Sequence, residues 1–272
     1  NPEKIFDLIR SRGINLFTGV PDSLLKDFCA FVTDSMSKEH HIIAANEGNA
    51  VAIAAGHYLG TGHPALVYMQ NSGVGNAVNP LLSLADSEVY SLPMLLMIGW
   101  RGEPGVNDEP QHVKQGRIMT NLMDALEIPW YRLSSNTECA SSVINDAINQ
   151  MNETKAPVAL LVSKGTFAKY SLQQDEPAKF QISREQAISN IVEHLDKSDL
   201  IVSTTGMTSR ELYEHRVKAN QGHSNDFLTV GSMGHTASIA LGLAKTQQKR
   251  KVFCIDGDGS VLMHMGALGI VG

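Results

Sequence analysis

The sequence has few cysteines, slightly few charged residues and no long apolar run. Its 272 residues include three cysteines, whose spacing is not typical of zinc binding and whose odd number cannot pair completely. We interpret all three as buried thiols in a reducing cytosol. The longest strongly apolar run, residues 92–100, is too short to cross a bilayer and contains Pro93. The first residues also lack the apolar core of a signal peptide. We therefore expect a cytoplasmic protein without a membrane segment.

Basic residues are a minority, with 22 Lys and Arg against 28 Asp and Glu. The net charge of -6 disfavours a general nucleic-acid or anionic-membrane surface, although it allows a local basic pocket. No Gly-x-Gly-x-x-Gly opens a strand-helix unit, which disfavours a nicotinamide-dependent oxidoreductase. The apolar share of 43% is typical of globular proteins, and the length suffices for two domains. We expect small molecules or protein as partners.

Residues 1–165 alternate short apolar runs with segments of helical length. The pattern predicts helices that start near Asp22, Glu47, Gly75, Lys114 and Asn136. Strands are predicted at 14–17, 41–45, 65–70, 94–98, 130–133 and 158–163. Such alternation is typical of a doubly wound parallel sheet with helices on both faces, so we expect an α/β domain.

The pattern lapses over residues 166–183, a polar stretch with Pro177 that we interpret as a linker. A second alternation follows in 184–272. Helices are expected at 184–195, 209–216 and 236–244, and strands at 200–204, 227–230 and 252–256. Three strands are too few for a complete doubly wound sheet, so we expect the C-terminal part of this second α/β domain to be missing from the chain.

The strongest chemical signal is Gly257-Asp258-Gly259-Ser260, directly after the last predicted strand. The backbone amides of Gly257, Gly259 and Ser260 are placed to face an anion at the start of the next helix. Asp258 offers a hard oxygen ligand for a magnesium ion that also binds phosphate oxygens. The alternative is an ordinary strand-to-helix turn in which Asp caps the helix.

Two further loops of the second half contain glycine at the ends of strands. They are Thr204-Thr205-Gly206-Met207 and Gly231-Ser232-Met233-Gly234-His235. Because ligands bind at the carboxyl ends of strands in open α/β sheets, these loops extend the candidate site. In the first half, Glu47 lies where a strand becomes a helix. Its alternative role is to complement the dipole at a helix N-terminus.

Together these segments resemble the thiamine diphosphate enzymes, whose diphosphate motif opens with Gly-Asp-Gly and ends at an Asn a couple of dozen residues later. The opening is present here, and the Asn would lie beyond Gly272. The resemblance implies thiamine diphosphate and Mg²⁺ as cofactors, with 1–165 as the pyrimidine-binding domain and 184–272 as the diphosphate-binding domain. It also implies that Glu47 hydrogen-bonds the aminopyrimidine ring and that Asp258 binds the metal.

Three separated segments resemble the phosphonopyruvate decarboxylases more closely: 18–23, 69–76 and 105–116. The resemblance implies a carboxy-lyase that converts 3-phosphonopyruvate to phosphonoacetaldehyde and carbon dioxide. One alternative is sulfopyruvate decarboxylase, whose two halves are usually separate subunits, so a single chain favours the phosphonate enzyme. A non-catalytic cofactor-binding subunit is the other alternative. In this superfamily the active sites lie between subunits, so a homodimer or larger homo-oligomer is expected.

The resemblance also assigns roles to single residues. The carbonyl of Gly231 is expected to receive the amino group of the cofactor, and Met233 to hold the cofactor bent, with core filling as the alternative for Met233. The cofactor-binding residues expected are Glu47, Asn71, Ser72, Gly73, Thr205, Gly206, Gly231, Ser232, Met233, Gly257, Asp258, Gly259 and Ser260.

The substrate carries two anionic groups and needs donors or cations to bind them. We expect these in the stretch after the strand 94–98, predicted as a loop, and in the turn that contains Asp22. The expected substrate-binding residues are Asp22, Arg101, Gln111 and His112, and His112 and Asp22 join Glu47 as catalytic candidates because they can transfer protons. The alternatives are a solvated loop histidine and an ordinary helix start at Pro-Asp-Ser.

Overall fold

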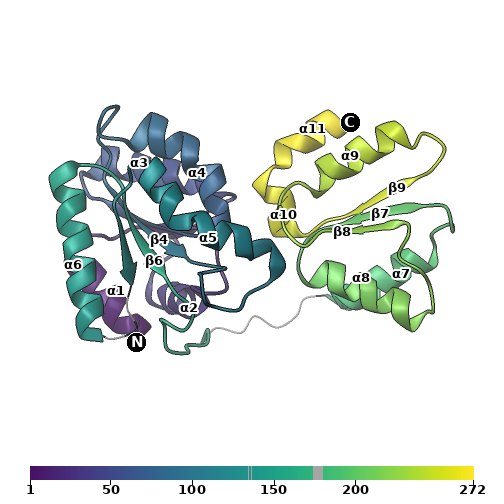
Figure 1. Cartoon of the computed structure of the whole chain (residues 1–272), viewed down its shortest axis with the longest axis horizontal. Coiled ribbons are helices and arrows are strands. Elements are labelled where there is room, and N and C mark those ends of the chain that lie inside the picture. The colour runs from purple at the N-terminus through teal and green to yellow at the C-terminus, as the bar shows by residue number, and fades with distance from the viewer. Residues whose placement is uncertain (134, 136, 174–179) are drawn as a thin grey trace. The chain divides into compact units, whose positions relative to one another are not determined.

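The computed structural model describes residues 1–133, 135, 137–173 and 180–272. The chain divides into two compact units, Asn1–Asp175 and Glu176–Gly272. Each unit is a parallel sheet with helices on both faces, which confirms the predicted α/β class (Figure 1). No helix in the described part of the chain is long and apolar enough to cross a membrane.

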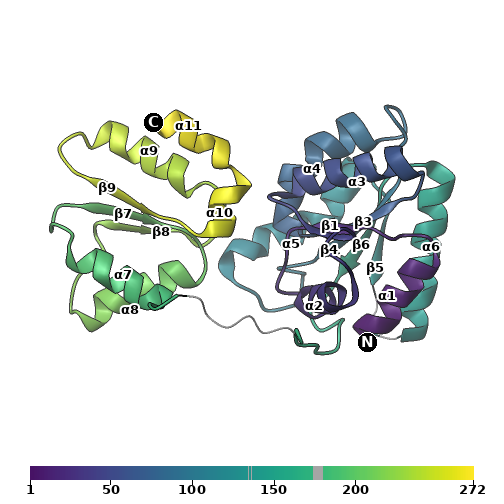
Figure 2. The ribbon, with the colours of Figure 1, turned by 180° about the vertical axis from the view of Figure 1, so that it is seen from behind.

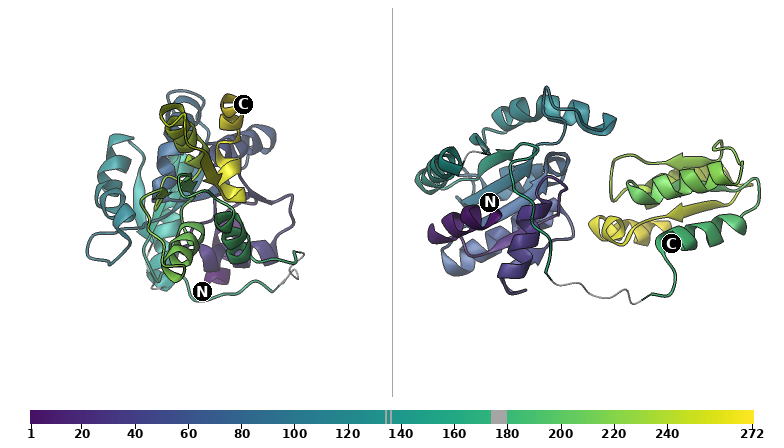
Figure 3. Two further views of the ribbon diagram at one scale, coloured as in Figure 1. Left: turned by 90° about the vertical axis from the view of Figure 1, so that its right-hand side faces the viewer. Right: turned by 90° about the horizontal axis from the view of Figure 1, so that it is seen from below.

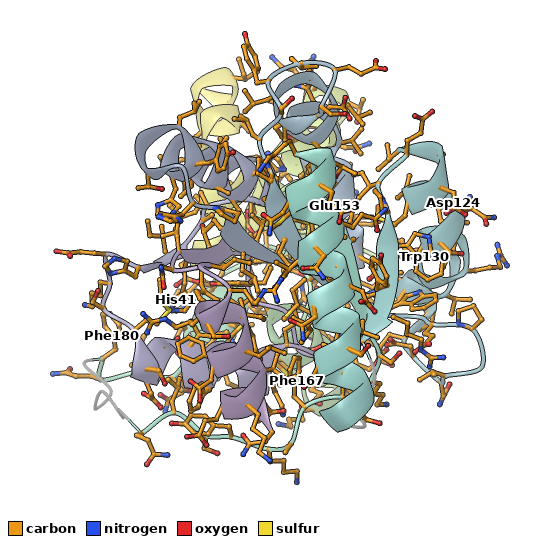
Figure 4. All side chains as sticks on the ribbon, turned by 90° about the vertical axis from the view of Figure 1, so that its left-hand side faces the viewer. His41, Asp124, Trp130, Glu153, Phe167 and Phe180 are labelled. Atoms are coloured by element: carbon orange, nitrogen blue, oxygen red, sulfur yellow. The ribbon has the colours of Figure 1, made fainter. Side chains whose placement is uncertain are left out.

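The first unit is built on six parallel strands. In spatial order they are β2 (His41–Ile43), β1 (Phe17–Gly19), β3 (Ala65–Gln70), β4 (Met94–Gly99), β6 (Val158–Val162) and β5 (Trp130–Leu133). The central strands β3 and β4 are apolar almost throughout and almost fully buried, as strands with helices on both faces must be. At the edge of the sheet, the Trp130 indole donates to Asp124 Oδ1 at 2.9 Å (Figure 4).

Helices cover both faces of this sheet (Figure 2). On one face lie α1 (Pro2–Ser11), α2 (Lys26–Ser35) and α6 (Thr137–Thr154), and on the other α3 (Glu47–Thr61), α4 (Val74–Pro80) and α5 (Pro110–Ala125). Two short turns, η1 (Asn71–Gly73) and η2 (Leu81–Ala85), flank α4. Side chains of β4 alternate between the two cores: Leu95 and Met97 face α1, α2 and α6, whereas Leu96 and Ile98 face the opposite helices.

The second unit has three parallel strands in the order β8 (Asp226–Leu228), β7 (Leu200–Ser203) and β9 (Val252–Ile255). Its layers are seen from two further directions in Figure 3. Helices α7 (Arg184–Glu193) and α8 (Met207–Lys218) pack on each other, and α9 (Thr236–Thr246) packs on β7 and β9. After β9 the described chain continues through α10 (Asp258–Met263), η3 (Met265–Ala267) and α11 (Leu268–Val271).

Several element boundaries differ from the predicted ones, for local reasons. Strand β1 lies at Phe17–Gly19 and not at 14–17, and α1 was not predicted. Helix α2 begins at Lys26 and not near Asp22, because the Asp22 carboxylate accepts a hydrogen bond from the Leu24 amide and forms a turn there. Helix α5 begins at Pro110 and not near Lys114, since proline is well suited to the first helical position.

The stretch predicted as a linker starts as a packed segment. The Phe167 ring stacks on Phe28 with the centroids 5.1 Å apart. The Tyr170 hydroxyl donates to Asp34 Oδ2 at 3.0 Å, and its amide donates to Asp27 Oδ1 at 3.1 Å. Residues 166–173 therefore pack against the first unit (Figure 4 labels Phe167), and 174–179 lie outside the described residues.

The cysteine prediction is confirmed at one position and wrong at another. Cys29 is buried, and burial raises the pKa of its thiol to about 12. Cys254 is exposed, because β9 is an edge strand of the described sheet. The side chain of Cys139 lies outside the described residues.

Candidate active site

Three buried polar side chains lie where strands of the first sheet end. Asp22, Glu47 and Asn71 are 6%, 4% and 4% exposed, and they follow β1, β2 and β3 respectively. Burial of carboxylates costs free energy unless neighbouring groups compensate. These three predicted residues therefore mark the carboxyl edge of the sheet as the candidate site of this unit.

Glu47 is the first residue of α3, and Asn46 caps this helix by accepting a hydrogen bond from the Asn49 amide at 2.9 Å. The Glu47 carboxylate is held from α4: Oε2 accepts from Asn76 Nδ2 at 2.7 Å. Oε1 lies against Gly73, where an ideal Cβ would stand only 2.2 Å away. The helix dipole favours this position for a carboxylate. The burial and the Asn76 contact go beyond what that alternative role requires.

Asn71 connects the end of β3 to the end of β4. Its Nδ2 donates to the Arg101 carbonyl at 2.8 Å, and its Oδ1 accepts from the Arg101 amide at 3.2 Å. The neighbouring Ser72 is exposed, and its hydroxyl accepts from Gln70 Nε2 at 2.9 Å. Asn71 is thus a buried structural contact of the site, whereas Ser72 faces solvent in this unit.

The guanidinium of Arg101 is paired within the site. Its Nε and Nη2 donate to the two carboxylate oxygens of Asp108 at 2.8 and 2.5 Å, and Nη1 donates to Ser23 Oγ at 2.7 Å. Asp108 strengthens the charged state and raises the pKa of Arg101. A substrate anion at Arg101 therefore has to share the guanidinium with Asp108.

Asp22 sits in the turn between β1 and α2. Its Oδ2 accepts from the Leu24 amide at 2.8 Å and lies against Gly99, where an ideal Cβ would be 2.2 Å away. Burial raises the pKa of Asp22, and the Leu24 hydrogen bond and the charge of Arg101 oppose this shift. A carboxyl with a raised pKa is suited to hold a proton at a reacting centre.

His112 and Gln111 lie in the first turn of α5, not in a loop as the sequence predicted. His112 Nδ1 is buried and has no hydrogen-bond partner among the described residues. Burial lowers the pKa of His112, and the charge of Arg101 lowers it further. The imidazole is therefore neutral at pH 7, so it acts as a hydrogen-bonding or proton-accepting group and not as a cation. Gln111 is partly exposed beside it.

Three glycine-containing loops meet at the carboxyl ends of the strands in the second unit. Thr205 and Gly206 follow β7, the segment 229–235 follows β8, and the Gly-Asp-Gly turn follows β9. The Ser260 hydroxyl accepts from the Gly234 amide at 3.0 Å and joins the second loop to the third. Gly206 and Gly234 have positive φ angles of 86° and 92°, so these turns favour glycine.

Met233 is 41% exposed, which argues against the alternative that it fills a core. Its methyl group lies beside the Gly-Asp-Gly turn, since an ideal Cβ on Gly259 would be 3.4 Å from Met233 Cε. The preceding Ser232 has a positive φ of 58°, which turns the chain at this point. Met233 is therefore displayed at the same sheet edge as Gly257 and Asp258.

Asp258 begins α10 and is exposed, with Oδ1 accepting from the Gly259 amide at 2.8 Å. Among the described residues, no group of three or more His, Cys, Asp or Glu side chains could hold a metal ion. A single carboxylate next to glycine amides nevertheless fits a magnesium ion that takes most of its ligands from phosphate oxygens and water. The residues of this turn fit a magnesium diphosphate and do not form a protein-only metal site.

Sequence reasoning missed three residues of the first site. Asp108 lies in the segment 105–116, which carries the family resemblance, but nothing in the sequence pairs it with Arg101. Ser23 and Asn76 also lie in segments that carry the resemblance, 18–23 and 69–76. Their contacts with Arg101 and Glu47 depend on how segments distant in sequence come together.

Both units match families of known proteins. Residues 2–127 match the thiamine pyrophosphate enzyme N-terminal TPP binding domain, and residues 204–271 match the C-terminal TPP binding domain. Phosphonopyruvate decarboxylase from Streptomyces viridochromogenes is 33% identical over 275 residues, which cover 96% of this chain and 67% of the relative. The chain thus spans about two thirds of the length of that protein.

Two sulfopyruvate decarboxylases are also similar. The protein from Methanosarcina acetivorans is 28% identical and covers 98% of this chain, with 71% of its own length matched. The beta subunit from Methanocaldococcus jannaschii is 44% identical over 89 residues, 33% of this chain and 44% of the subunit. Because the first of these relatives matches both units in one chain, the single-chain organisation does not favour the phosphonate enzyme, contrary to expectation. The chain belongs to the phosphonopyruvate decarboxylase family of thiamine diphosphate-dependent decarboxylases.

Proposed function

We propose that the protein decarboxylates 3-phosphonopyruvate to phosphonoacetaldehyde and carbon dioxide, with thiamine diphosphate and Mg²⁺ as cofactors. The observation that carries the proposal is the buried Glu47 carboxylate, which Asn76 holds against Gly73 in a chain that matches both TPP-binding domains. The 33% identical phosphonopyruvate decarboxylase supports the choice of substrate.

The two halves take different parts of the cofactor in this proposal. Residues 1–165 form the pyrimidine-binding domain and 184–272 the diphosphate-binding domain, and 166–183 connect them, with 166–173 packed on the first unit. Glu47 faces the aminopyrimidine with Asn71, Ser72 and Gly73 around it. The second half contributes Thr205, Gly206, Gly231, Ser232, Met233, Gly257, Gly259 and Ser260, with Asp258 as a ligand of Mg²⁺. When bound, thiamine diphosphate supplies the electron sink for the electron pair that carbon dioxide leaves behind.

The residues of the chain orient the reactants and manage protons. Glu47 offers its carboxyl group for proton transfer, and the hydrogen bond from Asn76 Nδ2 to Oε2 fixes the direction of that group. Asp22, with its raised pKa, holds a proton near the substrate. Neutral His112 and Gln111 donate hydrogen bonds to the substrate anions, and Arg101 contributes charge from its pair with Asp108. The buried edge around Asn71 and Gly73 keeps water out.

We further propose that the protein acts in the cytoplasm as a homodimer or larger homo-oligomer with active sites between subunits. The separate beta subunit of a related enzyme supports the idea that the two halves can work from different chains. Sedimentation of the full-length protein at increasing concentrations tests the proposal, with activity expected to disappear as the oligomer dissociates.

A second candidate function is the decarboxylation of sulfopyruvate. It is favoured by the 44% identity over 89 residues between this chain and the beta subunit of a sulfopyruvate decarboxylase. The deciding experiment measures kcat/KM of the purified full-length protein with both substrates. A higher kcat/KM for phosphonopyruvate is expected, and a strong preference for sulfopyruvate would overturn the assignment.

The Glu47→Gln variant tests the catalytic role in the same assay. It should lose about 10² to 10⁴ in rate, because a positioned acid or base contributes that much. Binding of thiamine diphosphate, measured by calorimetric titration, should persist. Cofactor binding without turnover of either substrate by the wild-type protein would instead indicate a non-catalytic subunit.

A further inference from the structure

Arg101 is the point at which three segments of the candidate site meet. Its backbone exchanges two hydrogen bonds with the Asn71 side chain after β3, at 2.8 and 3.2 Å. Its side chain reaches Ser23, next to Asp22 in the turn after β1, at 2.7 Å. The third contact is Asp108, which lies seven residues further along the chain and approaches the guanidinium with both oxygens. The path of the Arg101 side chain therefore determines what charge Asp22 faces.

Each carboxylate oxygen of Asp108 accepts two hydrogen bonds in this arrangement. Oδ2 accepts from Arg101 Nε and the Gly102 amide, both at 2.8 Å, and Oδ1 accepts from Arg101 Nη2 and the Glu109 amide. The side chains of Arg101 and Asp108 are only 17% and 11% exposed. A planar two-bond pair between a guanidinium and a carboxylate fixes direction as well as distance. Asp108 thus has four hydrogen bonds, all of which hold Arg101 and the loop that follows it.

We propose that Asp108 is a positioning residue for the decarboxylation, which directs the Arg101 guanidinium toward Ser23 and Asp22 and so fixes the turn that carries Asp22. The inference rests on the proposed function for the role of Asp22. It goes beyond that function because Asp108 need not touch substrate or cofactor. The Asn71 contacts to the Arg101 backbone transmit the same constraint to the end of β3.

Several charged or titratable groups surround this turn. Arg101 faces Asp22 from the end of β4, and Cys29 of α2 interacts with Asp22. Asp108, Glu109 and His112 lie around Arg101 on the other side. Two roles of Asp108 consequently predict opposite results. If Asp108 only contributes negative charge, its removal leaves Arg101 in place and lowers the pKa of Asp22. If Asp108 positions Arg101, its removal lets the guanidinium turn away and raises that pKa.

The test compares the full-length wild-type protein with Asp108→Asn, which keeps the shape of the side chain but removes the charge and two acceptor sites. The Asp22 carboxyl is titrated by NMR in protein labelled with ¹³C at aspartate, with Asp22→Asn to assign its signal. We expect the pKa of Asp22 to rise in Asp108→Asn. We also expect kcat to fall about 10- to 100-fold with a smaller change in KM, since misplacement of a reacting group by about 1 Å costs up to 10²-fold. A fall in this pKa, or no change in both pKa and kcat, would overturn the proposal.

A matched control removes a similar pair elsewhere. Arg184 of α7 and Glu211 of α8 also form a two-bond pair, at 2.8 and 2.7 Å, in the second unit. Glu211→Gln should leave kcat and the pKa of Asp22 unchanged. Arg101→Lys tests the same role from the other partner. Lysine keeps the positive charge but cannot form the two parallel hydrogen bonds that the guanidinium makes to the Asp108 carboxylate. It should reproduce the fall in kcat with thiamine diphosphate affinity retained, and wild-type kcat in Arg101→Lys would contradict the positioning role.

The experiment separates this inference from the proposed function. The NMR titration reports on Asp22 whether or not the substrate is turned over. If the wild-type protein fails to decarboxylate phosphonopyruvate, the proposed function fails. If it is active and Asp108→Asn retains the wild-type kcat and Asp22 pKa, only the positioning role fails.

Discussion

The Ser260 hydroxyl accepts a 3.0 Å hydrogen bond from the Gly234 amide, and this bond joins the loop after β8 to α10 after β9. Both groups are buried, so Ser260→Ala leaves an amide without a partner. We expect the free energy of unfolding to fall by about 1 to 3 kcal/mol and thiamine diphosphate to bind more weakly. Urea unfolding and calorimetric titration measure the two effects. Ser189→Ala is the control, since its hydroxyl bonds Glu193 at the exposed surface of α7. Wild-type cofactor affinity in Ser260→Ala would show that the loops do not depend on this bond.

Gly73→Ala should displace the Glu47 carboxylate, the proposed catalytic group, without straining the backbone. The new Cβ would lie 2.2 Å from Glu47 Oε1 and 2.6 Å from its Cγ, so Glu47 has to move. The expected result is a fall in kcat of about 10²-fold and a loss of about 1 to 3 kcal/mol of stability from overpacking. Steady-state kinetics and urea unfolding test both effects.

Gly75 provides the control for this substitution, since nothing lies within 4 Å of its ideal Cβ. Gly75→Ala, in the first turn of α4 directly after η1, should increase stability by about 0.5 to 1 kcal/mol because alanine is the better helix former. Equal kcat values for the two alanine variants would contradict the steric explanation.

Asp22→Asn should stabilise the protein at neutral pH while lowering its activity. Burial raises the pKa of Asp22 above its unfolded value, so the folded state retains a proton that the unfolded state has released. Wild-type stability is therefore lost as the pH rises from about 4 through the folded pKa. The asparagine variant avoids this loss. In urea unfolding, Asp22→Asn should be as stable as the wild type near pH 3 and more stable than it at neutral pH, with the full difference reached above the folded pKa of Asp22. A difference in the free energy of unfolding that shrinks as the pH rises would refute the assignment.

Removal of magnesium should affect the wild-type protein and Asp258→Asn differently. In the wild type, EDTA should weaken thiamine diphosphate binding strongly, because in the proposed site Asp258 would hold a magnesium ion together with the diphosphate. The asparagine variant loses the carboxylate ligand, so its cofactor affinity should be low with Mg²⁺ and change little when EDTA is added. Calorimetric titrations under both conditions provide the measurement. An equally strong effect of EDTA on both proteins would exclude Asp258 as a ligand.

The fold was largely predictable because its strands are buried on both faces. The apolar run at 65–70 coincides with the buried strand β3, the predicted strand 130–133 coincides with the edge strand β5, and Asn46 signals the start of α3 at Glu47. Errors occurred where one side chain changes the local path. The Asp22 carboxylate forms a turn, so α2 begins later than predicted. Pro110 occupies the first position of α5, so this helix begins earlier than the apolar pattern predicts.

The positions of the site residues were predictable, and their contacts were not. Asp22, Glu47 and Asn71 follow strands, and the carboxyl ends of parallel strands must share one edge. The pairing of Arg101 with Asp108, and of Glu47 with Asn76, depends on the course of whole loops and helices. For the same reason the sequence placed His112 in a loop, whereas it lies in the first turn of α5, where burial and the charge of Arg101 lower the pKa of its imidazole.

The alternation of side chains along β4 separates the tasks of the two helical layers. Glu47, Asn76 and His112 belong to α3, α4 and α5, which share one core, whereas α1, α2 and α6 share the other. The sheet backbone lies between these cores, so substitutions on opposite faces should add almost independently. Stabilising substitutions at core residues of α1 and α6, such as Ile9 and Ile148, should therefore leave the positions of Glu47, Asn76 and His112 almost unchanged.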